Sequence, residues 1–231
     1  MSGERVLLIT GASTGIGAET ARQAVADGWR VVLAARTEEK LEQLAAELGE
    51  DNALPHGCDV TEWADHERLV AAALARFGQI DAVFANAGFG AKRGFLEETP
   101  EQWRSMVLTN VLGVAYSIRS ALPHFKDRDR GHFILTSSVA GRRALPGSLY
   151  SSTKWAVCGM GEALRQEVAD TPIKMTLVEP GMVDTPFFEN RPGPDRALHD
   201  EDIARTVMFA LSQPPHVDLN EVLVRPINQA N

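Results

Sequence analysis

The amino-acid sequence predicts an α/β fold: a doubly wound parallel sheet of about seven strands, with helices on both faces. Short apolar segments rich in Val, Ile, Leu and Ala alternate with longer amphipathic segments along the whole chain. Strands that are apolar throughout are typical of parallel sheets covered on both faces. The first apolar segment also leads directly into a glycine-rich loop and then a helical pattern, as at the start of a Rossmann-type sheet.

The apolar periodicity predicts the individual elements. Strands are expected at residues 6–10, 31–35, 54–60, 82–86, 132–138, 174–179 and 221–225. Helices are expected at residues 15–27, 38–48, 63–77, 100–124, 149–169 and 201–213. Thr99 followed by Pro100 and Glu101 is a typical helix start. The proline-containing, polar segment 186–198 predicts a surface loop on the substrate side, so residues 1–231 are expected to form a single domain.

Composition narrows the class of partner. The formal net charge of −8 argues against a nucleic-acid or anionic-membrane surface. No apolar run reaches the roughly 18 residues of a membrane span. The six histidines show no metal-ligand spacing, so no metal site is expected. Only two cysteines occur, Cys58 and Cys158, which are too few for a disulfide framework and fit a reducing cytoplasm.

The glycine-rich loop after the first strand reads Thr-Gly-Ala-Ser-Thr-Gly-Ile-Gly over residues 10–17. Glycines permit a tight turn and close backbone approach, and the following helix start offers free N–H groups to a pyrophosphate. The residues expected to bind the cofactor here are Gly11, Ser13, Thr14, Gly15, Ile16 and Gly17. The spacing differs from the usual G-x-G-x-x-G, and the alternative is a simple glycine turn.

The second predicted strand ends without the carboxylate that usually binds the adenine ribose of NAD(H). Arg36 follows it instead, and its guanidinium can grip a 2′-phosphate. The sequence therefore predicts NADP(H), preferred over NAD(H). The alternative is that Arg36 is a solvated residue at the start of the next helix.

Tyr150 and Lys154 are four residues apart at the start of a predicted helix, so both side chains lie on one face. A free tyrosine has a pKa of about 10. A nearby ammonium lowers that pKa toward neutral pH, where the hydroxyl could give a proton to a carbonyl oxygen or remove it. A Tyr-x3-Lys pair alone is a weak signal and depends on its context.

That context resembles the short-chain dehydrogenase/reductase family over essentially the whole chain. The matching motifs, in order, are Thr10-Gly11-x3-Gly15-Ile16-Gly17, Cys58-Asp59-Val60, Asn86-Ala87-Gly88, Asn110, Ser137-Ser138, Tyr150-x3-Lys154 and Pro180-Gly181. The segment 220–226 is also similar, more weakly, to a branch of compact NADP-dependent reductases acting on small hydroxy acids or similar alcohols.

The resemblance implies four catalytic residues: Asn110, Ser138, Tyr150 and Lys154. Ser138 would hydrogen-bond the substrate carbonyl and Tyr150, and stabilise developing negative charge. Ser138 precedes Tyr150 by twelve residues, whereas Ser137 has the thirteen-residue spacing usual in the family, so either serine could serve. Asn110 would hold a water that links Lys154 to solvent, or merely satisfy a helix distortion.

The resemblance also implies cofactor and substrate contacts beyond the glycine loop. The further cofactor-binding residues would be Asp59, Val60, Asn86, Ala87, Gly88, Tyr150, Lys154, Pro180, Gly181, Val183 and Thr185. Asp59 would bind the adenine amino group, or instead cap the next helix. The pocket would be walled by Phe89, Met182 and Phe187, beside Ser138 and Tyr150. Arg142 could pair with a substrate carboxylate, or be a solvated loop residue.

Taken together, these features predict an oxidoreductase, a carbonyl reductase that transfers a hydride between NADP(H) and a small carbonyl or alcohol substrate. Tyr150 would act as general acid and base. The alternative is a non-catalytic sensor or scaffold that binds NADP(H). Relatives often assemble through their two long helices, here 102–124 and 149–169, so a homodimer or homotetramer is expected. Gly159, Gly161 and Ala163 would allow close helix packing.

Overall fold

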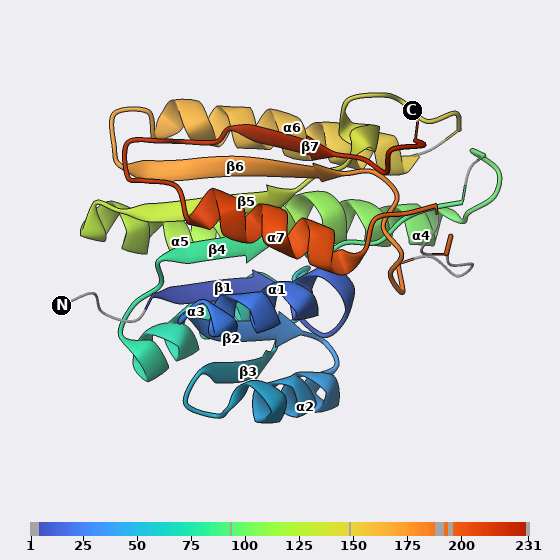
Figure 1. The fold of residues 1–231 in the computed structure, drawn as a ribbon. Coiled ribbons are helices and arrows are strands. Elements are labelled where there is room, and N and C mark those ends of the chain that lie inside the picture. Colours follow the sequence, from blue (N-terminus) through green and yellow to red (C-terminus); the bar gives the residue numbers. More distant parts are fainter. Residues whose placement is uncertain (1–4, 93, 148, 188–191, 194–195, 230–231) are drawn as a thin grey trace.

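A seven-stranded parallel sheet forms the centre of the computed structural model, which describes residues 5–229 except 93, 148, 188–191 and 194–195. The strands are β1 (Val6–Thr10), β2 (Arg30–Ala35), β3 (Ala53–Gly57), β4 (Ala82–Ala85), β5 (Gly131–Thr136), β6 (Ile173–Pro180) and β7 (Glu221–Val224). Their order across the sheet is β3-β2-β1-β4-β5-β6-β7 (Figure 1). The chain order therefore reverses between β1 and β4, the switch point beside which such sheets bind ligands.

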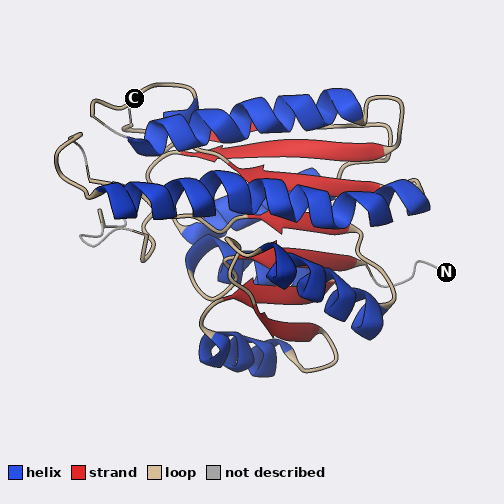
Figure 2. Cartoon of the chain, turned by 180° about the vertical axis from the view of Figure 1, so that it is seen from behind, coloured by secondary structure: helices blue, strands red, loops and turns tan. Residues whose placement is uncertain are grey.

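Helices cover both faces of this sheet, which confirms the predicted fold class. They are α1 (Gly15–Ala26), α2 (Glu38–Leu48), α3 (Trp63–Phe77), α4 (Pro100–Val107), α5 (Gly113–Arg128), α6 (Leu149–Glu167) and α7 (Asp200–Leu211). One apolar core lies between the sheet and α3, α5 and α6, the layer that faces the viewer in Figure 2. The other lies between the sheet and α1, α2 and α7. No helix in the described ranges is long and apolar enough to span a membrane.

Two strands end two or three residues earlier than predicted. The expected strand 132–138 stops at Thr136, and the expected strand 54–60 stops at Gly57. The last residue of β5 paired with β4 is Leu135, and the last paired with β6 is Thr136. Beyond those partners the backbone leaves the ladder although the sequence stays apolar or small. Ser137 and Ser138 therefore lie past the end of β5, where their side chains can reach other elements.

The predicted helix 100–124 is three segments in the structure. Thr99 caps α4, because its hydroxyl accepts from the backbone N–H of Gln102 while the Gln102 side chain accepts from the Thr99 N–H. This confirms the predicted start. A π-helix, η1 (Leu108–Leu112), then separates α4 from α5. The extra residue in this turn brings Asn110 into the interior, where it is fully buried.

Gly161 lets α6 approach β6 closely. A Cβ at this position would lie 2.9 Å from Leu177 Cδ2 and 3.2 Å from Met175 Sδ, both on β6. The expectation that Gly161 packs against another helix is therefore wrong, since its open side faces the sheet. Gly159 has no neighbour within 4 Å of such a Cβ and is exposed, as is Ala163.

We expect Gly161→Ala to lower the free energy of unfolding by about 1 kcal/mol. Overpacking a core contact costs about 1–3 kcal/mol, which exceeds the gain of up to about 1 kcal/mol from replacing a helical glycine by alanine. Urea unfolding measures the change. The same substitution in a Leu177→Val background should cost less, because the shortened side chain makes room. An equal cost in both backgrounds would show that the close contact is not the cause.

Candidate active site

Residues at the end of β5 hydrogen-bond Lys154 both at its side-chain ammonium and at its backbone carbonyl. The ammonium Nζ donates to the Thr136 carbonyl oxygen at 2.8 Å. The Ser137 hydroxyl donates to the backbone carbonyl of Lys154 at 3.0 Å. Lys154 is only 4% exposed, and its Nζ lies 5.7 Å from the centroid of the Tyr150 ring. The lysine and tyrosine of the sequence motif are thus neighbours that the end of β5 anchors.

Ser138 is the serine that meets Tyr150. Its hydroxyl hydrogen-bonds the Tyr150 side chain, donates to the Pro180 carbonyl at 3.3 Å and accepts from the Ala140 N–H at 3.1 Å. The last bond caps a short 3-10 helix, η2 (Val139–Gly141). Ser137 turns away toward α6. The structure therefore brings Ser138, and not Ser137, to the tyrosine.

Burial shifts both titratable groups of the motif. It raises the pKa of Tyr150 to about 12, and the hydrogen bond between Tyr150 and Ser138 offsets only part of that rise. Burial also lowers the pKa of Lys154 to about 8, because no carboxylate accompanies its ammonium. The expectation that Lys154 lowers the tyrosine pKa toward neutral is not met in this structure. Tyr150 is instead protonated at neutral pH, the state from which a hydroxyl donates.

Asn110 clamps the loop after β4. Its side-chain oxygen accepts from the Phe89 N–H at 3.0 Å, and its amide donates to the Phe89 carbonyl at 2.9 Å. The amide also lies 3.2 Å from the hydroxyl of Thr153, which donates to the Tyr150 carbonyl at 2.7 Å. Asn110 thus links the predicted pocket wall at Phe89 to the helix that carries Tyr150.

The glycine loop has the geometry that a pyrophosphate site needs. Gly11 and Gly15 have φ values of 68° and 54°, which favour glycine, and a Cβ at Gly17 would lie 2.3 Å from the Gly11 carbonyl oxygen. Helix α1 starts from Thr14 without a side-chain cap and without an acidic residue in its first turn. Its first N–H groups therefore lie at the carboxyl edge of the sheet without a capping side chain from Thr14 or from the first turn of α1.

Asn86 ties this loop to the catalytic side. Its amide lies 3.3 Å from the Thr10 carbonyl and 3.4 Å from that of Gly11. Its side-chain oxygen accepts from the Thr136 hydroxyl at 3.3 Å. The loop, the end of β4 and the end of β5 are thereby joined through one side chain.

Other predicted cofactor residues also converge on this region. A Cβ at Gly88 would lie 3.1 Å from Asn110 Oδ1 and 3.7 Å from Lys154 Nζ. A Cβ at Gly15 would lie 3.2 Å from Thr185 Cγ2, so the turn after β6 reaches the glycine loop. Close packing at these glycines brings the glycine loop, the turn after β6 and Gly88 to one edge of the sheet, beside the uncapped start of α1.

The residues predicted for the adenosine end lie apart from this cluster. Arg36 is exposed directly after β2. Asp59 follows β3, and its carboxylate accepts from the N–H and the hydroxyl of Thr61 at 2.9 and 2.8 Å. The cap position of α3 is Glu62, so Asp59 does not cap that helix as the alternative interpretation expected. Val60 is buried in the core, where its Cγ2 would be 2.9 Å from a Cβ at Gly113.

On the substrate side, Phe187 covers Tyr150. The two rings are edge to face with centroids 5.8 Å apart, and a Cβ at Gly90 would lie 2.7 Å from the Phe187 ring. Met182 and Val183 belong to a turn that pairs with Leu198, because Leu198 N–H donates to the Met182 carbonyl at 2.9 Å. Much of the predicted loop 186–198 lies outside the described residues.

The contacts of Arg142 contradict one expectation. They also involve residues that the sequence did not mark as part of the site. It pairs with Glu179 on β6 at 2.6 Å and with Glu221 on β7 at 2.5 Å, so it is not a free ligand for a substrate carboxylate. Glu179 and Cys158 join it in one cluster. Gln229, near the C-terminus, accepts from the Met182 N–H at 2.8 Å. No local pattern marks these long-range contacts.

Comparison with known proteins places the chain among dehydrogenases. A family model described as short chain dehydrogenase matches residues 5–195. An uncharacterized oxidoreductase of Staphylococcus haemolyticus (strain JCSC1435) is 41% identical over 225 residues, which cover 96% of this chain and 97% of that protein. An alcohol dehydrogenase from the archaeon Thermococcus sibiricus, complexed with 5-hydroxy-NADP, superposes with a TM-score of 0.92 at 32% identity over 99% of both chains.

A second solved structure carries a different coenzyme. It is a 3-ketoacyl-(acyl-carrier-protein) reductase from Brucella melitensis complexed with NADH. Its TM-score is 0.89 at 31% identity, over 96% of this chain and 98% of that one. The similar structures therefore bind both kinds of nicotinamide coenzyme.

The buried ammonium of Lys154 predicts a pH-dependent stability. The pKa of Lys154 is about 8 when folded and 10.5 ordinarily, so between these values the unfolded chain binds the extra proton and stability rises with pH. We expect the free energy of unfolding, relative to Lys154→Met, to rise by about 3 kcal/mol across this window. Urea unfolding at several pH values measures it. A difference that stays constant with pH would contradict the assignment.

Proposed function

The chain belongs to the short chain dehydrogenase family, and from that premise we propose that it is an NADP(H)-dependent oxidoreductase that interconverts small carbonyl compounds and alcohols. The observation that carries the proposal is the end of β5. There Ser138 meets Tyr150, while Thr136 and Ser137 hold Lys154 beside Gly88. An acid, an oxyanion donor and a cation thus meet next to a dinucleotide-shaped loop.

In the reductive direction, the bound nicotinamide supplies the hydride to the carbonyl carbon. Tyr150 gives its hydroxyl proton to the carbonyl oxygen, whose π electron pair becomes the new O–H bond. Ser138 donates to the same oxygen as negative charge develops there. Lys154 stabilises the phenolate left on Tyr150, and its position against Thr136 keeps the ammonium from solvent. Oxidation of an alcohol reverses each of these steps.

The residues present fit a dinucleotide, and Arg36 supports the phosphorylated form. Gly11, Gly15 and Gly17 would let the pyrophosphate approach the start of α1, and Thr185 would face the carboxamide. Arg36 is exposed directly after β2, at the place where a carboxylate usually binds the adenine ribose of NAD(H). Asn86, Ala87, Pro180, Gly181 and Val183 would line the rest of the groove, with Asp59 near the adenine.

We further propose that the chain assembles with itself through the exposed sides of α5 and α6. Trp155 on α6 is 50% exposed, and Val107, the last residue of α4, is 41% exposed, so both side chains offer apolar surface to a second copy. Gly159 and Ala163 are exposed on the same helix and would let a second copy approach closely.

Both thiols, Cys58 and Cys158, are free and buried, as fits a reducing cytoplasm.

Tyr150→Phe tests the catalytic proposal. The substitution removes the proton donor and keeps the ring, so turnover of NADPH with a panel of aldehydes and ketones should fall by at least about 100-fold. Coenzyme binding, followed by fluorescence titration, should persist. Tyr116→Phe is the matched control, because Tyr116 packs against Trp63 and His66 between α3 and α5. Wild-type turnover in Tyr150→Phe would refute the role; a wild-type protein that binds NADPH and never oxidises it would favour a sensor.

Arg36→Ala tests the coenzyme preference. Loss of a charge-assisted contact to the 2′-phosphate should raise the KM for NADPH by about 10- to 100-fold. The KM for NADH should stay unchanged, since that coenzyme lacks the phosphate. Lys40→Ala is the control, because Lys40 is also an exposed cation and lies on α2. Equal effects on the two coenzymes, or a wild-type protein that prefers NADH, would overturn the proposal.

A further inference from the structure

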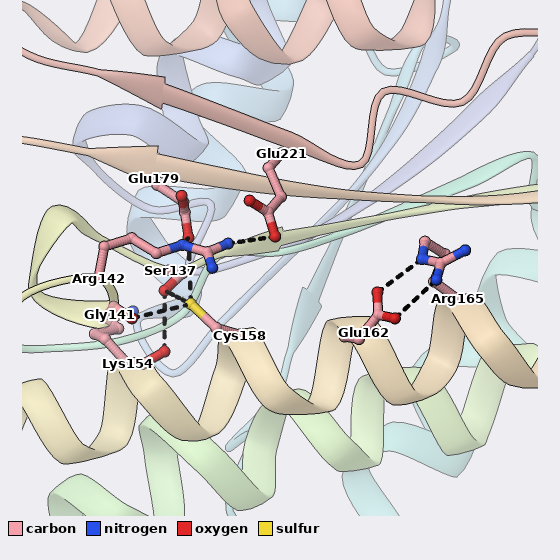
Figure 3. A network of polar contacts seen from close by, with 9 residues as sticks. All are labelled: Ser137, Gly141, Arg142, Lys154, Cys158, Glu162, Arg165, Glu179 and Glu221. Carbon is pink, nitrogen blue, oxygen red and sulfur yellow. Dashed lines mark hydrogen bonds and ion pairs between the residues drawn. The ribbon is translucent and has the colours of Figure 1, made fainter.

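A chain of polar side chains runs behind the candidate active site from α6 to the edge of the sheet (Figure 3). Ser137 Oγ lies 3.1 Å from Cys158 Sγ, and Cys158 Sγ lies 3.2 Å from Glu179 Oε1. The same carboxylate oxygen accepts from Arg142 Nε at 2.6 Å. The far end of Arg142 pairs with Glu221 at 2.5 Å. We refer to Arg142, Cys158 and Glu179 as the strap.

Charge and burial make the strap specific. Glu179 is 1% exposed, and a carboxylate so buried is stable only when it is paired and hydrogen-bonded. Arg142 supplies the positive charge. Burial raises the pKa of Cys158 to about 11, so the thiol keeps its proton and can donate it to the carboxylate. Its role is thus that of a hydrogen-bond donor rather than a nucleophile.

Each end of the strap is adjacent to a contact of the reacting groups. Arg142 follows η2 directly, and η2 starts from Ser138. Glu179 precedes Pro180, whose carbonyl accepts from the Ser138 hydroxyl. Cys158 lies one turn beyond Lys154 on α6; the Ser137 hydroxyl donates to the Lys154 carbonyl and lies 3.1 Å from Cys158 Sγ. The strap therefore connects β6 and α6 to Ser137 and Ser138.

We propose that Arg142, Glu179 and Cys158 are positioning residues for the reaction, which hold the backbone of Ser137 and Ser138 so that Ser138 reaches Tyr150. The inference rests on the proposed function. Arg142 restrains the C-terminal end of η2, while the Cys158 and Glu179 pair restrains its N-terminal end against β6. Without the strap, the segment after β5 loses the ion pair that ties the end of η2 to β6, and the Ser138 hydroxyl can turn from the tyrosine.

Arg142→Met is the primary test, because methionine keeps the apolar stem and removes the charge. We expect kcat to fall at least about 10-fold, since a small displacement of a reacting group has effects of this order or larger. The KM for NADPH should stay within about twofold, because the strap does not touch the glycine loop. Arg142→Lys, which can still pair with Glu179, should recover part of kcat.

Arg165→Met is the matched control. Arg165 pairs with Glu162 at 2.7 Å on the exposed side of α6, well separated in Figure 3 from the strap. The control removes an arginine–glutamate pair by the same substitution. It should leave kcat, both KM values and the Tyr150 signal described below unchanged.

A second readout needs no turnover. The chain has two tyrosines, Tyr116 and Tyr150. NMR of protein labelled at tyrosine Cζ, with Tyr150→Phe for assignment, reports whether the Tyr150 hydroxyl is hydrogen-bonded. Arg142→Met should shift the Tyr150 resonance and leave that of Tyr116 in place. A merely structural ion pair would lower the melting temperature without moving this signal.

The outcomes separate the two proposals. A wild-type kcat and an unchanged Tyr150 resonance in Arg142→Met would overturn the positioning role. If that variant does not fold, Arg142→Met with Glu179→Gln removes both charges and keeps an acceptor for Cys158, and the same criteria decide. If the wild type shows no turnover with any carbonyl, the proposed function fails, and the Tyr150 resonance still decides whether the strap positions Ser138.

Discussion

The hydrogen bonds made by three consecutive residues where β5 leaves the sheet determine the geometry of the site. The Thr136 carbonyl accepts from the Lys154 ammonium, the Ser137 hydroxyl donates to the Lys154 backbone, and Ser138 meets Tyr150. Strand β5 is paired with β4 as far as Leu135 and with β6 as far as Thr136. Its end therefore cannot shift along the sheet without breaking these backbone hydrogen bonds. The sheet thereby sets the distance between α6 and the reacting groups.

The glycine loop depends on the same edge through a different constraint, that of close packing. Gly17 has no room for a Cβ against the Gly11 carbonyl, so α1 begins with its N–H groups directly behind the loop. Asn86 then hydrogen-bonds both this loop and Thr136. A displacement of the glycine loop would therefore also displace the residues at the end of β5. Groups that act together in one reaction need such fixed relative positions.

Two buried ionisable groups are stabilised in different ways. The Lys154 ammonium donates to the Thr136 carbonyl, and burial lowers its pKa to about 8. Glu179 is paired with Arg142, which itself reaches the surface beside Glu221. The unpaired group lies among the reacting side chains and the paired one lies behind them. Burial of an unpaired charge is costly for folding, and such costs concentrate at functional sites.

The sequence by itself determined the alternation of strands and helices, the glycine loop, the Thr99 cap and the Tyr150–Lys154 spacing. These depend on local periodicity and on side chains a few residues apart, so they can be recognised in one dimension. Only the tertiary structure decided between Ser137 and Ser138, broke the long helix at Asn110 and engaged Arg142 with Glu179. Those outcomes depend on where neighbouring strands end and on contacts between residues tens of positions apart, which no local pattern encodes.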